Sequence, residues 1–483
     1  MTSAGVTDAV APPPALSRSD RAVIGVLLVA TFVVILNETI MGVALPVLLT
    51  ELNVTAAVGQ WLTAGFLLTM SVVIPVTGYL IQRVPTRVLY GIAMSLFSAG
   101  TLLAALAPGF TVLLAARVVQ ACGTAIMLPL LMTTVMTLVP VARRGAVMGN
   151  ISIVISVAPA IGPAVSGLVL DQYGWRAMFW VVLPISVTTL VLGLRWVTRI
   201  GESSSAPIDV LSVVLSVFGF GGLVYGLSNI GHGGGAGSTA TLWASLAVGV
   251  LGITAFVLRQ VALQRHERAL LDLRTFASRT FTLSSALMMI TMGLLLGVVT
   301  ILPIYTQNVL LLDPLATGLL LLPGGLLMGL LSPFVGRLYD RVGPRLLLIV
   351  GTTATSASLW FATSFDGSTP AALVLVFHLT LSLGLAFTFT PLFSAGLGAL
   401  PARLYSHGSA IFGTTQQLAA AAGVALLVSV MSARAAELAA SGQPTASADM
   451  GGMHSSILLA AIISVVAVAG SLMIKGGKAE SPA

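Results

Sequence analysis

The sequence predicts an all-α polytopic membrane protein with fourteen spanning helices. Of its 483 residues, 57% are hydrophobic and only 8% are charged, and the mean hydropathy is +1.04. A soluble domain carries about 25% charged residues, so this chain cannot form a water-exposed surface of ordinary composition. A spanning helix needs about 20 apolar residues, and fourteen stretches meet that requirement: 22–49, 58–81, 88–107, 110–139, 147–170, 177–198, 209–229, 241–259, 280–311, 316–336, 345–364, 371–399, 408–432 and 455–474.

The basic residues predict which ends of these helices face the cytoplasm, because Lys and Arg collect in short cytoplasmic loops. With the N-terminus inside, all but three of the 22 basic residues fall on the cytoplasmic side; the exceptions are Arg176 and Arg434 outside and Arg117 within a span. This alternation predicts a multi-pass protein of the cell membrane with both termini cytoplasmic. The net charge of +7 is spread over these loops, so the sequence indicates no nucleic-acid partner.

An internal repeat divides the helices into two halves. GYLIQRVPTR (78–87) follows the second span and GRLYDRVGPR (336–345) follows the tenth, with Gly, Leu, Arg, Val and Arg at matching offsets. Paired repeats with a site between them are typical of transporters. We therefore expect two six-helix bundles joined by two inserted helices: an N-terminal tail at 1–20, the N-terminal bundle at 21–200, a linker with a basic cytoplasmic loop at 201–279, the C-terminal bundle at 280–475 and a C-terminal tail at 476–483.

The basic loop at 259–279 has apolar residues among its charges, namely Leu270, Leu271, Leu273 and Phe276. Such a segment can lie along the inner membrane surface with its apolar side chains in the lipid. It can equally be a solvated connector between two spans. The sequence leaves both interpretations open.

Three ionisable side chains lie within the predicted spans, where charged groups are costly and usually functional. Glu38 is in the first span, Arg117 in the fourth and His378 in the twelfth, and helix rise places all three between the middle and the outer half of the bilayer. A carboxylate that gains and loses a proton beside a buried arginine can couple proton movement to transport. The alternatives are a static buried ion pair and, for His378, a hydrogen-bonded structural residue.

The sequence lacks the signatures of an ATP-driven pump and of a metalloenzyme. It contains no G-x-x-x-x-G-K-[ST] motif and no H-E-x-x-H motif. Its single cysteine, Cys122, excludes an intrachain disulfide and a cysteine-based metal site. We therefore expect a protein that is not an enzyme and has no catalytic residues, no metal site and no cofactor.

The chain resembles the major facilitator superfamily, in its fourteen-helix drug/proton antiporter branch of EmrB/QacA type. Both copies of the repeat are similar to the family's loop signature, G-x-L-x-D-R-x-G-R-R/K. The matching residues are Gly78, Leu80, Arg83 and Arg87 in the first copy and Gly336, Leu338, Asp340, Arg341, Gly343 and Arg345 in the second.

The loop signature implies a charge-assisted latch between helices that biases the inward or outward state. An Asp–Arg pair near a helix end can do this, because it forms in one state and breaks in the other. The first copy has Gln82 in place of the acid and Pro85 in place of the glycine. We therefore expect the latch in the second copy and topology anchoring by arginine in the first.

Two further motifs lie in the fourth and fifth spans and are similar to the family's R-x-x-Q-G motif and to the antiporter motif of its exporters. The matching residues are Arg117, Gln120 and Gly123 in LAARVVQACGTA (114–125) and Gly162, Pro163 and Gly167 in APAIGPAVSG (158–167). The first implies a fixed buried positive charge that responds to a nearby acid. The second implies a tight contact between the bundles that prevents leakage, since small residues let helices approach closely.

The first span departs from the family at the position of its acid. ILNETIMGVALP (35–46) is similar to L-D-x-T-x-x-x-x-A-L-P, but Asn37 occupies the Asp position and Glu38 follows it. One residue corresponds to about 100° of rotation around a helix. We therefore expect the carboxylate of Glu38 to face a different neighbour from the family's Asp.

The resemblance implies a monomeric proton-coupled antiporter that exports amphipathic, lipophilic or cationic drug-like molecules by alternating access. The proton gradient would drive it without a cofactor, and its partners would be substrate, protons and the lipid bilayer. Two alternatives remain open: a dedicated exporter of one endogenous metabolite or antibiotic, and a non-transporting membrane receptor. The candidate substrate-binding residues are polar groups in the spans, namely Asn37, Glu38, Tyr305, Gln307, Asn308, Gln416 and Gln417.

Overall fold

The computed structural model describes residues 17–54, 56–59, 61–198, 209–229 and 236–474. Over these ranges, fourteen helices are long and apolar enough to cross a membrane, which confirms the predicted number of spans. The predicted N-terminal tail up to residue 16, linker residues 199–208 and the predicted C-terminal tail lie outside the described residues.

The chain forms helices in three groups. The N-terminal group comprises α1 (Arg18–Glu51), α2 (Ala56–Gly59), α3 (Trp61–Arg83), α4 (Thr86–Ala105), α5 (Phe110–Leu138), η1 (Val141–Arg143), α6 (Arg144–Tyr173) and α7 (Trp175–Trp196). The inserted group comprises α8 (Val210–Asn229), α9 (Ala236–Leu263), η2 (Gln264–His266) and η3 (Leu273–Ala277). The C-terminal group comprises α10 (Arg279–Ile304), η4 (Tyr305–Val309), α11 (Pro314–Val342), α12 (Pro344–Ala362), α13 (Ala371–Gly398), η5 (Ala402–Leu404), α14 (Tyr405–Ala440) and α15 (Thr445–Leu472).

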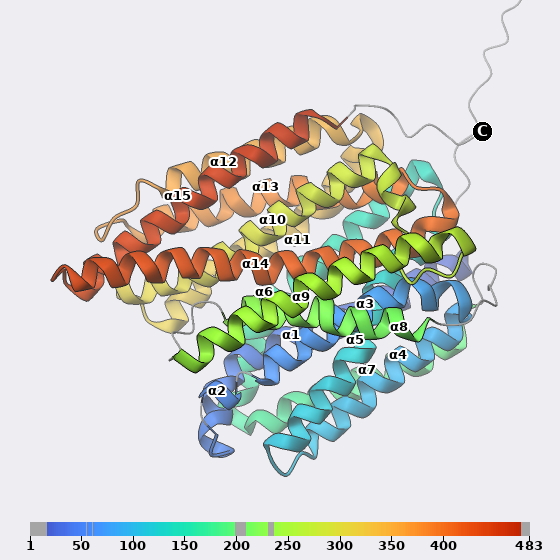
Figure 1. The fold of residues 1–483 in the computed structure, drawn as a ribbon, viewed down its shortest axis with the longest axis horizontal. Helices are drawn as coiled ribbons and strands as arrows, with labels where there is room; N and C mark the ends of the chain where they lie inside the picture. Colours follow the sequence, from blue (N-terminus) through green and yellow to red (C-terminus); the bar gives the residue numbers. More distant parts are fainter. Residues whose placement is uncertain (1–16, 55, 60, 199–208, 230–235, 475–483) are drawn as a thin grey trace, which may run out of the picture.

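The N-terminal and C-terminal helices lie side by side as two bundles, shown in the lower and upper parts of Figure 1. The two bundles meet mainly where α6 packs against α11 and where α3 packs against α14. In the inserted pair, α8 contacts both α3 and α14, whereas α9 packs mainly against α8. The insertion therefore lies over the seam between the two bundles.

Local sequence sets the two ends of α11. The Asp313 side chain accepts a hydrogen bond from the Ala316 amide at 2.7 Å, which satisfies a free N–H of the first turn. The helix ends at Gly343, whose φ of 77° lies in the left-handed region that glycine adopts without strain. The second copy of the loop signature therefore needs its glycine for a sharp turn into α12.

The α14–α15 hairpin is longer than predicted. The predicted span was 408–432, but α14 has 36 residues and a length of about 54 Å by helix rise, against about 30 Å of hydrocarbon. Similarly, α15 begins at Thr445 rather than at residue 455. The paired ends of these helices form the tip at the left of Figure 1.

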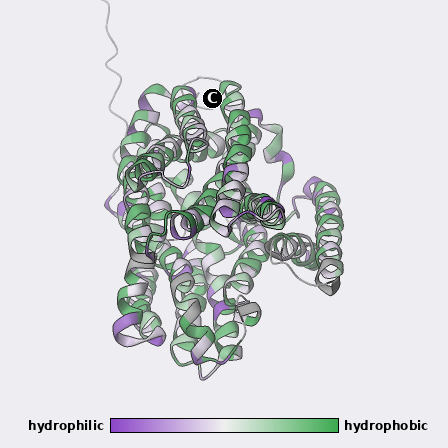
Figure 2. Ribbon diagram, turned by 90° about the vertical axis from the view of Figure 1, so that its left-hand side faces the viewer, coloured by the Kyte–Doolittle hydropathy of each residue, from purple (hydrophilic) through white to green (hydrophobic). Residues whose placement is uncertain are grey.

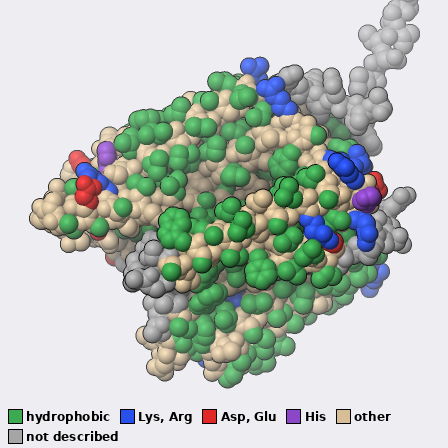
Figure 3. Space-filling model, in the orientation of Figure 1, with side chains coloured by type: hydrophobic (Ala, Val, Ile, Leu, Met, Phe, Trp, Pro, Cys, Tyr) green, Lys and Arg blue, Asp and Glu red, His purple; other side chains and the backbone are tan. Residues whose placement is uncertain are grey.

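The polar residues lie mainly at the ends of the helices. Figure 2 looks along the molecule from the side of this tip and shows hydrophobic residues over most of the helical surface. On the face shown in Figure 3, most Lys and Arg side chains gather at the end opposite the tip. We call the end that carries Arg83, Arg144 and Asp340 the inner end, because the charge pattern predicts that it faces the cytoplasm.

Candidate functional site

The site is centred on Glu38 of α1 and Arg117 of α5. Glu38 is half-buried, whereas Arg117 is completely buried. Arg117 is the charged group whose field acts on Glu38, although the two side chains form no direct ion pair in the described part of the chain. The structure thus brings together two of the three predicted proton-coupling residues, at a separation that leaves their ion pair unformed.

The Arg117 guanidinium is only partly satisfied by hydrogen bonds. Its Nε donates to the Leu62 carbonyl at 3.4 Å, and its Nη1 donates to Gln120 Oε1 at 3.1 Å. It also lies over the ring of Phe66, 4.1 Å from the ring centroid, in a cation–π contact. Its Nη2 is buried and has no hydrogen-bond partner among the described residues.

A buried donor without a partner costs about 1–3 kcal/mol, and more when the group is charged. Arg117 therefore gains free energy if an ionised carboxylate moves into contact with Nη2. Glu38 is the carboxylate whose charge acts on Arg117. Gln120, which orients Arg117, is itself held by a hydrogen bond from its Nε2 to Thr101 Oγ1 at 2.9 Å.

Asn37 occupies a different environment from Glu38. It is only 1% exposed, and neither polar atom of its side chain has a hydrogen-bond partner in the described structure. Glu38 is the half-buried member of the pair. A role for Asn37 in substrate binding stays a prediction.

His378 lies in the other bundle. Its Nε2 is 3.0 Å from the Leu321 carbonyl, so the ring links α13 to α11. The ring packs so closely on α11 that a side chain at Gly324 would collide with it. The charged groups that act on Glu38 and Arg117 do not include His378. This geometry suits a structural residue, and proton coupling by His378 stays a prediction.

Two candidate substrate residues form structural contacts near the outer end. Tyr305 is 1% exposed, and its hydroxyl donates to the Asp366 carbonyl at 2.8 Å. It lies in η4, a single π-helical turn that follows Pro303. Asn308 Nδ2 donates to Asp449 Oδ2 of α15 at 3.3 Å. Both side chains hold neighbouring elements together, and substrate binding by Tyr305 and Asn308 stays a prediction.

The remaining candidate substrate residues differ in their surroundings. Gln307 is partly exposed, while Gln416 is 7% exposed and its Nε2 has no partner among the described residues. Gln417 Nε2 lies 3.7 Å from Met70 Sδ, across the contact between α14 and α3. Gln417 therefore lies at the seam between the bundles, and substrate binding by all three glutamines stays a prediction.

The second copy of the loop signature connects the bundles through backbone groups. Asp340 Oδ1 accepts from the Gly145 amide at 2.8 Å, and Asp340 Oδ2 accepts from the Ala146 amide at 2.9 Å. These are free N–H groups in the first turn of α6, where the helix dipole also favours a negative charge. We expected an Asp–Arg pair, but the carboxylate binds a helix N-terminus.

The glycine of this signature explains why the contact is so close. A Cβ on Gly336 would lie 2.1 Å from the Gly145 carbonyl oxygen, so only glycine fits there. The two arginines of the signature, Arg341 and Arg345, are exposed at the inner end. A topology role for these two arginines stays a prediction.

The first copy makes an equivalent contact with an amide. Gln82 Nε2 donates to the Arg403 carbonyl at 2.8 Å, so this position joins α3 to the start of the α14 region without an acid. Gly78 faces α14, where an added Cβ would lie 3.0 Å from Ala410 Cβ. Arg83 stacks over the Tyr79 ring at 3.6 Å, and Arg87 is exposed.

The antiporter motif packs α6 against α1, within the N-terminal bundle. A Cβ on Gly162 would lie 2.1 Å from Thr39 Oγ1, and Ser166 Oγ donates to the Ile40 carbonyl at 3.0 Å. Gly167 has no atom within 4 Å of an added Cβ, and the side chain of Pro163 lies outside the described residues. The motif therefore fixes the helix that carries Glu38.

The contact of α6 with the other bundle includes Ala160 of the motif and residues that precede the motif. Glycines on α11 meet α6 residues from the inner end to the middle of the helices, in the pairs Gly336–Gly145, Gly329–Val157 and Gly325–Ala160. The expected contact between bundles exists on α6, but Gly162 is not the residue that makes it.

Sequence reasoning missed several residues that close the inner end. Arg144 Nη1 donates to the Tyr405 hydroxyl at 3.1 Å, and Thr133 Oγ1 and Ser409 Oγ are 2.7 Å apart. Both contacts join the two bundles. Arg144 was counted only as a topology charge, and isolated Ser and Thr residues in spans give no sequence signal. Side-chain hydrogen bonds between the bundles, among described residues, lie between the middle and the inner end, as expected for a closed inner gate.

Known proteins are similar to this chain in sequence and in fold. Residues 27–424 match the family model of the Major Facilitator Superfamily. The uncharacterized MFS-type transporter YcnB of Bacillus subtilis is 41% identical over 95% of this chain and 96% of its own length. The lincomycin resistance protein LmrB is 41% identical in Bacillus subtilis, over 84% of both chains, and 39% identical in Listeria monocytogenes, over 85% of this chain and 86% of that protein.

Among solved structures, the human organic anion transporter MFSD10 (TETRAN) superposes with a TM-score of 0.65 at 13% identity, covering 95% of this chain and all of that chain. At that identity the likeness shows a common fold. Together with the fourteen spans, these matches identify a multi-pass membrane transporter rather than an enzyme. The chain belongs to the major facilitator superfamily.

Proposed function

We propose that the protein is a proton-coupled antiporter that exports amphipathic, lipophilic or cationic small molecules from the cell. The observation that carries this proposal is the Glu38–Arg117 pair, in which a half-buried glutamate lies within the field of a buried guanidinium whose Nη2 has no hydrogen-bond partner among the described residues. We further propose that it works as a monomer with both termini in the cytoplasm and without a cofactor.

The pair can couple a proton to transport because its two protonation states favour different geometries. Ionised Glu38 is attracted to Arg117 Nη2, whereas protonated Glu38 has no such attraction and is released toward the accessible side. A substrate cation competes with the proton for the same carboxylate. Inward movement of one positive charge supplies about 2.3 kcal/mol per 100 mV of membrane potential.

The names of two relatives suggest the first substrate to test. LmrB proteins that are about 40% identical to this chain are named for lincomycin resistance. In everted vesicles containing the full-length protein, an inward-directed accumulation of lincomycin should follow acidification of the lumen and should collapse when an uncoupler is added. Lincomycin accumulation that is unaffected by the uncoupler would contradict proton coupling.

The same names also favour a narrower alternative, in which the protein exports one antibiotic or metabolite. A panel of drugs separates the two proposals. Broad export predicts raised resistance to several chemically unrelated lipophilic cations in cells that express the protein. Resistance confined to a single compound would favour the dedicated exporter.

A further inference from the structure

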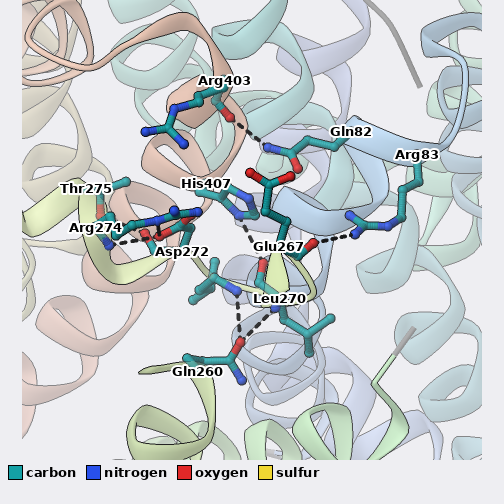
Figure 4. Close-up of polar contacts among 11 residues, drawn as sticks. Gln82, Arg83, Gln260, Glu267, Leu270, Asp272, Arg274, Thr275, Arg403 and His407 are labelled. Atoms are coloured by element: carbon teal, nitrogen blue, oxygen red, sulfur yellow. Dashed lines mark hydrogen bonds and ion pairs between the residues drawn. The ribbon is translucent and has the colours of Figure 1, made fainter. Parts of the chain in front are cut away.

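The loop between α9 and the C-terminal bundle is inserted into the inner end of the molecule. We call residues 264–272 the strap. Its first part is exposed at Arg265–Arg268, but Ala269, Leu270, Leu271 and Asp272 are all at most 5% exposed. These residues neither lie along the membrane surface nor form a solvated connector, so both sequence interpretations are wrong for this part of the loop. Figure 4 shows the strap between the end of α3 and the start of α14.

The strap is fixed to the C-terminal bundle. His407 Nδ1 of α14 lies 3.2 Å from the Leu270 carbonyl, and His407 is itself only 4% exposed. The carboxylate of Asp272 accepts from the backbone amide of Arg274 at 2.9 Å and caps η3, which packs against α10. The second half of the strap therefore moves with α14 and α10.

The strap is also fixed to the inserted helices. Gln260 of α9 is completely buried, and its Oε1 accepts from the Leu270 amide at 2.7 Å and from the Leu271 amide at 3.3 Å. Gln260 Nε2 donates to Ser212 Oγ of α8 at 2.8 Å. One buried side chain thus sets the position of the strap relative to the α8–α9 pair.

The contact with the N-terminal bundle is the exposed one. Arg83 Nη2 of α3 donates to the Glu267 carbonyl at 3.2 Å. Glu267 has a φ of 54°, a left-handed conformation that is uncommon for a residue other than glycine or asparagine. Such conformations persist where the surrounding structure enforces them, often at switch regions. Here the conformation turns the carbonyl of Glu267 toward α3.

We propose that the strap is a lock on the closed inner gate, through which the inserted helices α8 and α9 control the conformational cycle. It remains on the C-terminal bundle and holds the N-terminal bundle through Arg83, beside the direct Gln82–Arg403 contact. Opening of the inner end breaks the Arg83–Glu267 bond, while the Gln260 and His407 contacts persist. Removal of either of these anchors therefore favours the inward-open state.

Accessibility of a buried cysteine tests the lock. In full-length protein with Cys122→Ala, Ser406→Cys provides the labelling site. Ser406 is 4% exposed and its backbone lies against Gly78 across the seam. Its hydroxyl makes no hydrogen bond in the described structure, so the exchange to cysteine removes no hydrogen bond. The rate of maleimide labelling in nanodiscs reports opening of the inner end. Loss of one hydrogen bond should raise this rate about five-fold.

Two variants should produce this increase: His407→Leu, which loses the bond to Leu270, and Gln260→Leu, which loses the bonds that hold the Leu270 and Leu271 amides on α9. His407→Gln keeps a donor and should restore the slow rate. Arg265→Ala is a matched control in an exposed part of the strap and should label like the parent.

An insertion of two glycines after Arg265 lengthens the strap without removing a buried group, and it should also raise the labelling rate. If the folded Gln260→Leu protein and the insertion both label at the parental rate, the strap does not hold the gate. If Gln260→Leu does not fold, the insertion alone decides. The assay uses neither substrate nor a proton gradient, so its outcome is independent of whether export is proton-coupled.

Discussion

The contact of Asp340 with the start of α6 should hold the inner end closed. Its two carboxylate oxygens accept from the Gly145 and Ala146 amides at 2.8 and 2.9 Å, across the seam between the bundles. In Asp340→Asn, one oxygen can still accept, but the side-chain NH₂ opposes the second backbone N–H. The variant loses one hydrogen bond to a charged acceptor and the attraction of the charge to the helix N-terminus.

The magnitude follows from these two losses. A hydrogen bond to a charged group contributes about 1.5–3 kcal/mol, and a charge at a helix N-terminus adds about 0.3–1 kcal/mol. Asp340 is partly buried, so a total near 2 kcal/mol is expected. That energy corresponds to a shift of about thirty-fold toward the state in which the inner end is open.

Double electron–electron resonance spectroscopy, which measures the distance between two spin labels, reports this shift. Labels at Arg87→Cys and Arg345→Cys, in a Cys122→Ala background, place one exposed probe on the inner end of each bundle. Asp340→Asn should move most of the distance distribution to longer values. Asp366→Asn, the same exchange between α12 and α13, serves as the control. A distribution identical to the parent in the Asp340 variant would refute the role assigned to this contact.

Two other predictions concern packing and pH. Gly162→Ala should lower the free energy of unfolding of the purified protein by about 1–3 kcal/mol, because its Cβ would lie 2.1 Å from Thr39 Oγ1. Gly167→Ala should leave this free energy unchanged, because there is open space around Gly167. Equal stability of the two variants would contradict this packing. The hydrogen bonds from Arg259 hold the pKa of Asp209 well below its usual range. Because the pKa of Asp209 is depressed in the folded state, the stabilisation by its ion pair with Arg259 is complete at pH 7 and is lost as the pH falls below about 4. The melting temperatures of the parent and of Asp209→Asn should therefore converge on acidification. A difference that stays constant with pH would argue against the ion pair.

The number of spans could be predicted because the bilayer imposes both length and apolar composition. The extension of α14 could not, since SARAAELAA (432–440) favours a helix without being apolar enough to signal a span. The position of the strap could not be predicted from the sequence either. Its position depends on contacts with Arg83 and His407, which are distant in sequence and belong to no motif that predicts these contacts.

The sequence predicted part of the candidate site. Glu38 and Arg117 stand out because a charge in an apolar run is rare, and the structure places them within electrostatic reach. The partner of Asp340 was predicted wrongly, because sequence shows side chains and not the free N–H groups of a helix start. The Thr133–Ser409 contact was missed, since Ser and Thr in helices commonly bond to their own backbone.

The departure of the first span from its family pattern now has a structural meaning. Asn37, at the position of the family's acid, is buried with no partner for its polar atoms, whereas Glu38 is partly exposed near Arg117. The off-by-one acid therefore lies within the field of Arg117, and Asn37 is not among the charged groups that act on it. This is why the coupling role is proposed for Glu38 and not for its neighbour.

The central claim is that Glu38 couples the proton to export, and Glu38→Gln tests it most directly. In proteoliposomes, exchange of labelled for unlabelled lincomycin requires alternating access but no net proton movement, whereas accumulation driven by a pH gradient requires coupling. We predict that the variant loses pH-driven accumulation but retains exchange at a raised lincomycin concentration, because it loses only the ionic part of substrate binding. Accumulation equal to that of the parent protein would contradict the assignment of Glu38 as the coupling site.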